Sequence, residues 1–165
     1  MGAAADEVWS VRKMARVALF IALSVLGGWI VFPSPLGTVA LDSVPGYFLV
    51  LFAGQLEGGL VLTIGHLLSA FKAGVPLGPI HLLIAVIMFG CGIAFYQLVK
   101  RSNAIIAVGI TTLLNGVVAN LILIPLLGTG FFLSMSPVLS LASLVNISLA
   151  YGLYSLLKDR FEWEK

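Results

Sequence analysis

The sequence contains little charge, one cysteine and two histidines, and each shortage excludes a class of protein. Charged residues make up 10% of the 165 positions and leave a net charge of +2. Without a clustered basic stripe, this charge argues against nucleic acid as a partner. Cys91 alone allows neither an internal disulfide nor a multi-cysteine metal site. His66 and His81 have no carboxylate at metal-ligand spacing, so we predict no metal site.

Motifs for catalysis are missing as well. No serine stands in a nucleophile-elbow pattern, and there is no Walker A sequence or soluble domain that could hydrolyse ATP. We therefore predict a binding function rather than an enzyme, and no cofactor.

Apolar residues are abundant. They make up 60% of the chain, and the mean hydropathy is +1.11. A soluble domain of this size cannot bury so much apolar surface, so lipid must solvate most of it. At roughly 20 residues per pass, about six membrane helices fit. The sequence predicts an all-α integral membrane protein.

Prolines, glycines and charges divide the chain into six predicted transmembrane helices within one domain, residues 1–165. The longest interruption is 32–47, which contains three prolines and two glycines. We expect Pro33 and Pro125 to end the first and fifth helices, and Glu57 to mark the tip of a hairpin. The predicted helices are at about 13–32, 46–54, 58–72, 80–99, 103–124 and 137–157.

Basic residues orient this bundle. If the N-terminus is cytoplasmic and there are six passes, only Lys72 lies on the outer side. Such a bias follows the positive-inside rule, and it predicts that both termini are cytoplasmic. The basic residues placed inside are Arg12, Lys13, Arg16, Lys100, Arg101, Lys158, Arg160 and Lys165.

Polar side chains gather in the outer half of this predicted bundle, and the inner half is almost purely apolar. Polar groups inside membrane spans usually face a partner or a cavity. The asymmetry predicts a pocket open to the outside over a closed floor, rather than a through-pore. The candidate binding residues are Trp29, Asp42, Ser43, Tyr47, His66, Lys72, His81, Asn115, Asn120 and Asn146.

Each candidate also has a structural interpretation. A histidine can bond a neighbouring backbone carbonyl, and an asparagine can join two helices. Trp29 could be an aromatic residue at the membrane interface, and Lys72 could be an ordinary residue at the end of a helix. Asp42 could form a turn. A further alternative is a stand-alone proton-coupled carrier that uses Asp42 and both histidines, with binding linked to pH in the histidine range.

Small residues form a stripe on the first predicted helix. Ala15, Ala18 and Ala22 stand at i, i+3 and i+7, so another helix can approach closely. The approaching helix could belong to this chain or to a partner.

These features resemble a family of membrane proteins. The six-helix size, the basic flank and Ala18-x-x-x-Ala22 resemble the substrate-binding (S) components of energy-coupling factor (ECF) vitamin transporters. The segments PLGTVALDSVPGY at 35–47, GHLLSA at 65–70 and PLGPIHLL at 76–83 look most like the subgroup associated with alpha-ribazole uptake for cobamide salvage.

The resemblance implies a multi-pass protein of a prokaryotic cytoplasmic membrane that binds a vitamin or precursor near the outer face. It also implies that Ala15, Ala18 and Ala22 dock onto a transmembrane coupling subunit driven by two ATPase subunits. The nickel and cobalt branch carries an N-terminal histidine site. Here the chain begins Met1-Gly2-Ala3-Ala4, which argues against metal uptake.

The candidate residues suit a neutral, nucleoside-like ligand. Trp29 and Tyr47 could stack on a fused ring, while Asp42, the histidines and the asparagines could bond sugar hydroxyls. Lys72 is the one cation among them, which disfavours a phosphorylated ligand. Riboflavin, pantothenate or a queuosine precursor would suit the same set of side chains.

Overall fold

The computed structural model describes residues 9–34 and 39–160, and these residues are almost entirely helical. The β-type pairing within them is one isolated bridge between Val31 and Ala40. The elements are α1 (Val11–Gly27), α2 (Val44–Phe52), α3 (Gln55–Lys72), α4 (Ile80–Arg101), α5 (Ala104–Leu113), η1 (Leu114–Val118) and α6 (Ala119–Leu157).

The first helix ends at Gly27, earlier than the expected end at Phe32. Two adjacent glycines, rather than Pro33, provide the stop. The backbone at Gly27 lies against the returning chain, where an added Cβ would stand 2.4 Å from the Leu41 carbonyl oxygen. Residues 28–30 form a turn, after which the chain is extended, and the Phe32 N–H donates to the Val39 carbonyl at 2.8 Å.

The second half of the chain differs from the predicted pair of helices at 103–124 and 137–157. α5, η1 and α6 follow one another without a loop, and Pro125 and Pro137 both lie inside α6. Proline is tolerated inside a membrane helix where neighbouring groups satisfy the freed backbone carbonyl, so neither proline ends α6. The direction changes at Gly128, whose φ of 80° suits a residue without a side chain.

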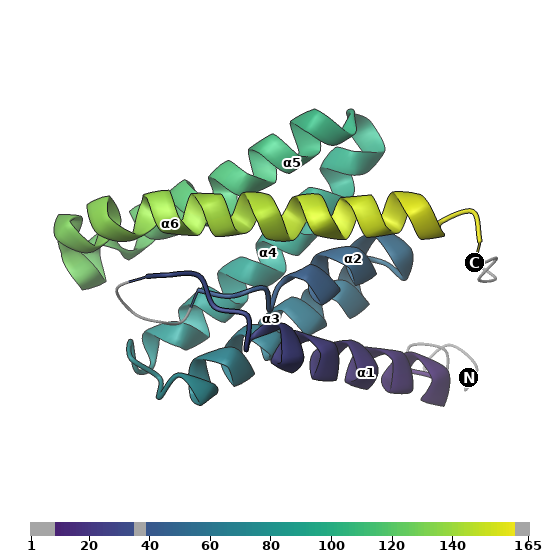
Figure 1. Cartoon of the computed structure of the whole chain (residues 1–165), viewed down its shortest axis with the longest axis horizontal. Helices are drawn as coiled ribbons and strands as arrows, with labels where there is room; N and C mark the ends of the chain where they lie inside the picture. Colours follow the sequence, from purple (N-terminus) through teal and green to yellow (C-terminus); the bar gives the residue numbers. More distant parts are fainter. Residues whose placement is uncertain (1–8, 35–38, 161–165) are drawn as a thin grey trace, which may run out of the picture.

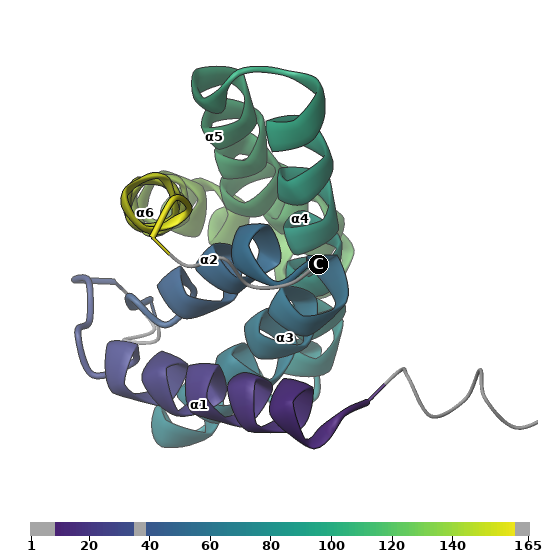
Figure 2. The same cartoon turned by 90° about the vertical axis from the view of Figure 1, so that its right-hand side faces the viewer.

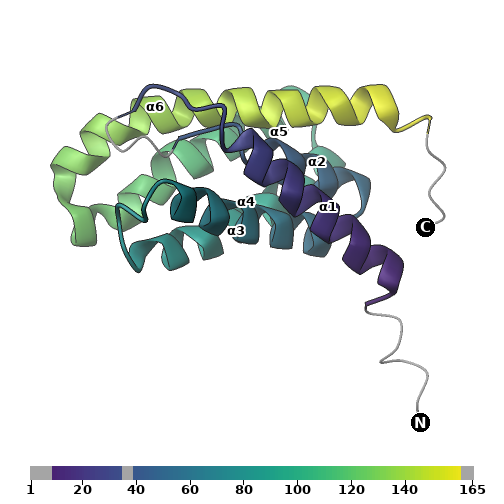
Figure 3. The same ribbon diagram turned by 60° about the horizontal axis from the view of Figure 1, so that its bottom comes forward.

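The helices form one bundle in which α2 and α3 occupy the centre. Figure 2 shows them between α1 on one side and α4 and α5 on the other, with α6 alongside. α3 packs against α1, α2 and α4, and α2 packs against α6. The described ends of α1 and α6 lie at the same end of the bundle (Figure 1), and α1 runs obliquely to α6 (Figure 3).

The outer surface of the bundle is apolar. Large hydrophobic side chains are exposed on several helices, for example Ile105 at 85% and Leu156 at 71%. Two helical stretches, Ile80–Arg101 and 104–157, are long and apolar enough to cross a membrane. Such a surface is expected where lipid is the solvent.

A buried ion pair joins α1 to α3. The Arg16 guanidinium donates to both carboxylate oxygens of Glu57, at 2.7 and 2.8 Å. Glu57 follows the α2–α3 turn and is 6% exposed, so it is a buried partner of α1 as well as the marker of the hairpin tip.

Candidate functional site

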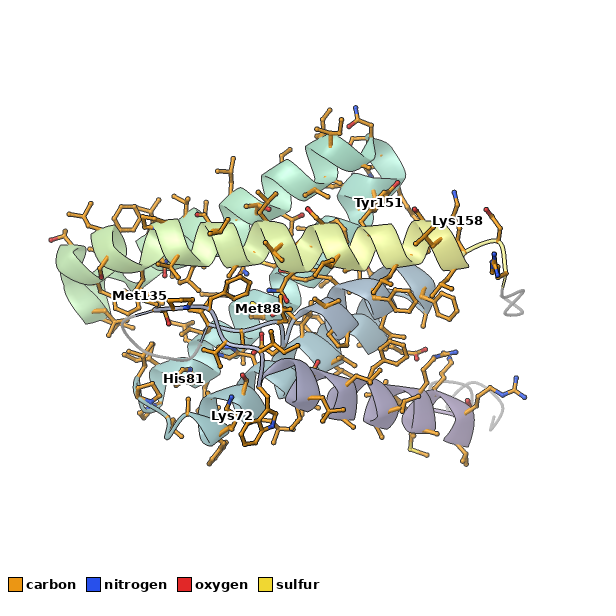
Figure 4. All side chains as sticks on the ribbon, viewed as in Figure 1. Lys72, His81, Met88, Met135, Tyr151 and Lys158 are labelled. Atoms are coloured by element: carbon orange, nitrogen blue, oxygen red, sulfur yellow. The ribbon has the colours of Figure 1, made fainter. Side chains whose placement is uncertain are left out.

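A small polar cavity lies among α3, α4, η1, α6 and the segment 39–43 that leads into α2. Its volume is about 90 Å³. Figure 4 labels three lining residues, His81, Met88 and Met135, away from the end that carries Lys158. Seven of the ten candidate residues line this cavity: Asp42, Ser43, His66, His81, Asn115, Asn120 and Asn146.

Asn146 holds the 39–43 segment against α6. Its side-chain oxygen accepts from the Ser43 backbone N–H at 3.2 Å, and its amide donates to the carbonyls of Ala40 and Ala142 at 3.0 and 2.8 Å. Both amide hydrogens of Asn146 therefore bond backbone carbonyls and are not available to a ligand. Asn146 acts first as a clamp that positions Asp42 and Ser43 at the edge of the cavity.

Asp42 is a buried carboxyl group in the loop between α1 and α2. It is 8% exposed, and it accepts a hydrogen bond from the Ser43 hydroxyl at 3.0 Å. Burial raises the pKa of Asp42 to about 6, although hydrogen bonds from Ser69 and Ser43 and the charge of Lys72 partly oppose this rise. At neutral pH the group is mainly an ionised acceptor facing the cavity.

The two histidines contact each other across α3 and α4. His81 Nδ1 lies 3.2 Å from His66 Nε2, and His81 Nε2 accepts from the Leu77 backbone N–H at 3.4 Å. His81 is 3% exposed, whereas His66 is half-buried. The pair forms one wall of the cavity.

Asn115 and Asn120 combine interhelical bonding with free hydrogen-bonding capacity. Asn115 donates to the Ser143 hydroxyl at 2.8 Å, which leaves its second amide hydrogen and its carbonyl. Asn120 donates to the Gly116 carbonyl at 2.8 Å and to the Ser136 hydroxyl at 3.2 Å, which leaves its carbonyl. Both the linking role and the binding role therefore remain chemically possible for each residue.

Three candidates do not line this cavity. Trp29 is 69% exposed, and Lys72 Nζ lies 4.7 Å from the centroid of its ring. The same ammonium donates to the Gly28 carbonyl, so Lys72 fastens α3 to the end of α1. Tyr47 is fully buried and packs edge-on against Phe95 in the core.

Several lining residues were not predicted. Ser143 precedes Asn146 by one helical turn, and this spacing could have identified it. Phe131, Met88 and Met135 also line the cavity, yet an apolar residue in an apolar helix gives no signal in the sequence. Ser69, whose hydroxyl bonds the Asp42 carboxyl group, was not among the candidates either.

Polar groups also lie outside the cavity in the described bundle. Thr111 and Thr112 are buried on α5, and neither hydroxyl has a hydrogen-bond partner. The Arg16–Glu57 pair lies beside the other basic residues of α1. Polar side chains are therefore not confined to the cavity lining.

The cavity is contracted compared with an occupied ligand site. Its 90 Å³ holds a few water molecules, whereas small-molecule sites usually measure about 300–1,000 Å³. A nucleoside-sized ligand therefore needs more space than the cavity has in this structure.

A second, apolar groove lies between α1, α2 and α6. It measures about 810 Å³, and Ala15, Leu19 and Leu23 of α1 face Leu149 and Leu153 of α6 across it. Leu41 and Val44 line this groove, while Asp42 and Ser43 between them line the cavity. The two compartments share the segment 41–44 as a wall.

The fold and the cavity define a class: a helical membrane protein that encloses a polar cavity beside an apolar groove. Residues 12–158 match the family model described as "ECF transporter, substrate-specific component". The chain belongs to this family, whose members are transporter subunits rather than enzymes and reside in the prokaryotic cell membrane. No curated protein and no solved structure matches the chain. The family implies a small-molecule substrate and ECF module partners.

Proposed function

We propose that this protein captures a vitamin or vitamin precursor, with alpha-ribazole as our preferred ligand, in the cavity between the 39–43 segment and α6. The convergence of seven polar side chains from α3, α4, η1, α6 and the preceding loop carries this proposal. These side chains supply both donors and acceptors, which sugar hydroxyls need.

The topology that we propose has six passes with both termini cytoplasmic, which places the cavity toward the outer face. Lys72 and His81 lie in one half of the bundle and Lys158 at the opposite end (Figure 4), as this orientation requires. The cytoplasmic end then carries Arg12, Lys13 and Arg16, and the positive-inside rule supports this choice.

We propose that Ala15, Ala18 and Ala22 form the docking surface for the transmembrane coupling subunit. All three are exposed on α1, so internal packing does not use them. Ala15 also lines the apolar groove, which offers an apolar partner helix a long contact. The two ATPase subunits then act through the coupling subunit.

The direct test is native mass spectrometry of the purified protein with the ligand it retains. A bound mass equal to alpha-ribazole supports the preferred ligand. A bound mass equal to riboflavin, pantothenate or a queuosine precursor would change the identity of the ligand but would still support the binding function. Asp42→Ala should lower affinity at least tenfold, whereas Ser155→Ala, on exposed α6, serves as the matched control.

Transport assays separate this proposal from a proton-coupled carrier. A binding subunit reconstituted alone should bind its ligand but should not move it across the membrane. Uptake by the isolated protein, driven by a pH gradient, would favour the carrier.

A further inference from the structure

The histidine pair has a defined direction of hydrogen bonding. The Leu77 backbone N–H can only donate, so His81 Nε2, at 3.4 Å from it, must carry a lone pair. A neutral His81 then bears its hydrogen on Nδ1 and donates it to His66 Nε2 at 3.2 Å. His66 Nε2 is thereby the acceptor, and the hydrogen of His66 lies on Nδ1.

Other states of the pair lose these bonds. Turning the His81 ring over places carbon atoms opposite the Leu77 N–H and His66 Nε2. If His81 is protonated, its Nε2–H faces the Leu77 backbone N–H, and neither group can accept. If His66 is protonated, its Nε2–H faces the Nδ1–H of His81 in the same way. Because His81 is 3% exposed, each of these states leaves a buried donor without an acceptor in the described part of the chain.

The one donor that remains is the His66 Nδ1–H. His66 lines the cavity, and no acceptor from the described part of the chain bonds to this hydrogen. We infer that His81 is a positioning residue that holds His66 as a hydrogen-bond donor, and that the ligand presents an uncharged acceptor, such as a ring nitrogen or a carbonyl oxygen, to His66. This inference rests on the proposed binding function.

Charge limits the acceptor to an uncharged group. Asp42 contributes a carboxyl group to the lining, and the lining contains no lysine or arginine. Lys72 directs its ammonium to the Gly28 carbonyl and the Trp29 ring instead. A phosphate or carboxylate could accept from His66, but it would stand unpaired beside Asp42 in a site with little water.

Nuclear magnetic resonance of the ring nitrogens tests the tautomers directly. The chain has two histidines, so ¹⁵N-histidine labelling with a histidine-free affinity tag yields signals from this pair alone. We expect both rings to be neutral and protonated on Nδ1 from pH 6.5 to 8. An Nε2–H form or an imidazolium at His66 would overturn the inference.

Two variants separate positioning from general structural support. His81→Asn can still donate an amide hydrogen near the former Nδ1, so His66 should keep its Nδ1–H form. His81→Leu cannot donate, and His66 should shift toward the Nε2–H form that free imidazole prefers. Because His66 is then the sole histidine, its spectrum reports the change without overlap. An identical His66 spectrum in both variants would contradict the positioning role.

Binding measurements test the acceptor. Alpha-ribazole and its 5′-phosphate serve as probes, and we expect the phosphate to bind at least tenfold more weakly. His81→Leu should weaken alpha-ribazole binding about tenfold, and His81→Asn should restore most of it. Equal affinity for both probes would overturn the charge argument. If neither probe binds, the preferred ligand is wrong, while the tautomer spectra still decide the histidine assignment.

Discussion

Asn146 of α6 accepts a hydrogen bond from the Ser43 backbone N–H across 103 positions of sequence, at 3.2 Å. The same side chain donates to the Ala40 carbonyl, so one residue connects α6 to both ends of a short loop segment. The lining of the cavity depends on this connection because Asp42 lies between the two bonded positions.

Asn146→Ala should therefore weaken both folding and binding. The Ser43 N–H and the Ala40 carbonyl lose their partner, at a cost of about 1–3 kcal/mol for buried groups. Thermal unfolding in detergent and ligand affinity measure the two effects. As a control, Ser155→Ala removes a hydroxyl from exposed α6 and should change neither. If the Asn146→Ala protein binds the ligand with unaltered affinity, the Asn146 hydrogen bonds do not support the binding site.

The stability of the protein should fall as the pH rises through about 6. The pKa of Asp42 is raised from 3.8 to about 6, so the folded protein holds this proton more tightly than the unfolded chain. The resulting stabilisation is complete below about pH 4 and is lost above pH 6. We expect the melting temperature to drop by about 5 °C between these limits. Asp42→Asn should flatten this dependence, and an unchanged slope would assign it to another group.

Removing one partner of the Arg16–Glu57 pair should be more damaging than removing both. Glu57→Gln removes the carboxylate charge that faces the Arg16 guanidinium in a mostly buried position, at a cost of about 3 kcal/mol. The double variant Arg16→Met, Glu57→Leu has no uncompensated charge and should recover most of this stability. Denaturation of the single and double variants in the same detergent checks the order. A double variant less stable than Glu57→Gln would contradict it.

Gly116 in η1 should not tolerate a side chain. An added Cβ would lie 2.5 Å from Ser140 Cα, so the backbones of η1 and α6 would have to separate. Gly116→Ala should cost about 1–3 kcal/mol and disturb the adjacent Asn115 and Asn120. Gly109→Ala on the exposed face of α5 meets no atom within 4 Å and should be neutral or stabilising by up to about 1 kcal/mol. Comparable melting temperatures for the two variants would refute the close crossing.

Docking through α1 should be sensitive to bulk. Ala18→Trp places a large ring on the exposed alanine face, so we expect loss of co-purification with the coupling subunit. Ligand binding should be retained because the alanine stripe is absent from the cavity lining. Val86→Trp, at a 67% exposed position on α4, tests whether any added tryptophan has this effect. Assembly of the Ala18→Trp protein would rule out this docking surface.

Sequence reasoning located most of the cavity because polar side chains are rare in this chain. In an apolar background, residues such as His66, Asn120 and Asn146 are conspicuous, and membrane burial brings such groups together. Trp29, Tyr47 and Lys72 were included wrongly as lining residues because the sequence indicates only how deep each residue lies in the membrane. The direction in which each side chain points depends on how the helices are rotated.

The helix boundaries, like the side-chain directions, depend on contacts that the sequence alone does not reveal. Pro33 and Pro125 are strong helix-stop signals in water, yet α1 ends at Gly27 and the direction of α6 changes at Gly128. The change of direction falls at Gly128 rather than at Pro125 because glycine adopts the positive φ that it needs. At Gly27 the cause is a contact with Leu41, which no local pattern reveals.

The shared wall between groove and cavity makes the two compartments mechanically dependent. Leu41 and Val44 face one side, Asp42 and Ser43 face the other, and α6 borders both. If ligand binding moves α6 or the 41–44 backbone, the shape of the groove changes as well. We therefore expect a coupling subunit that docks in the groove to respond to a filled cavity without contacting the ligand.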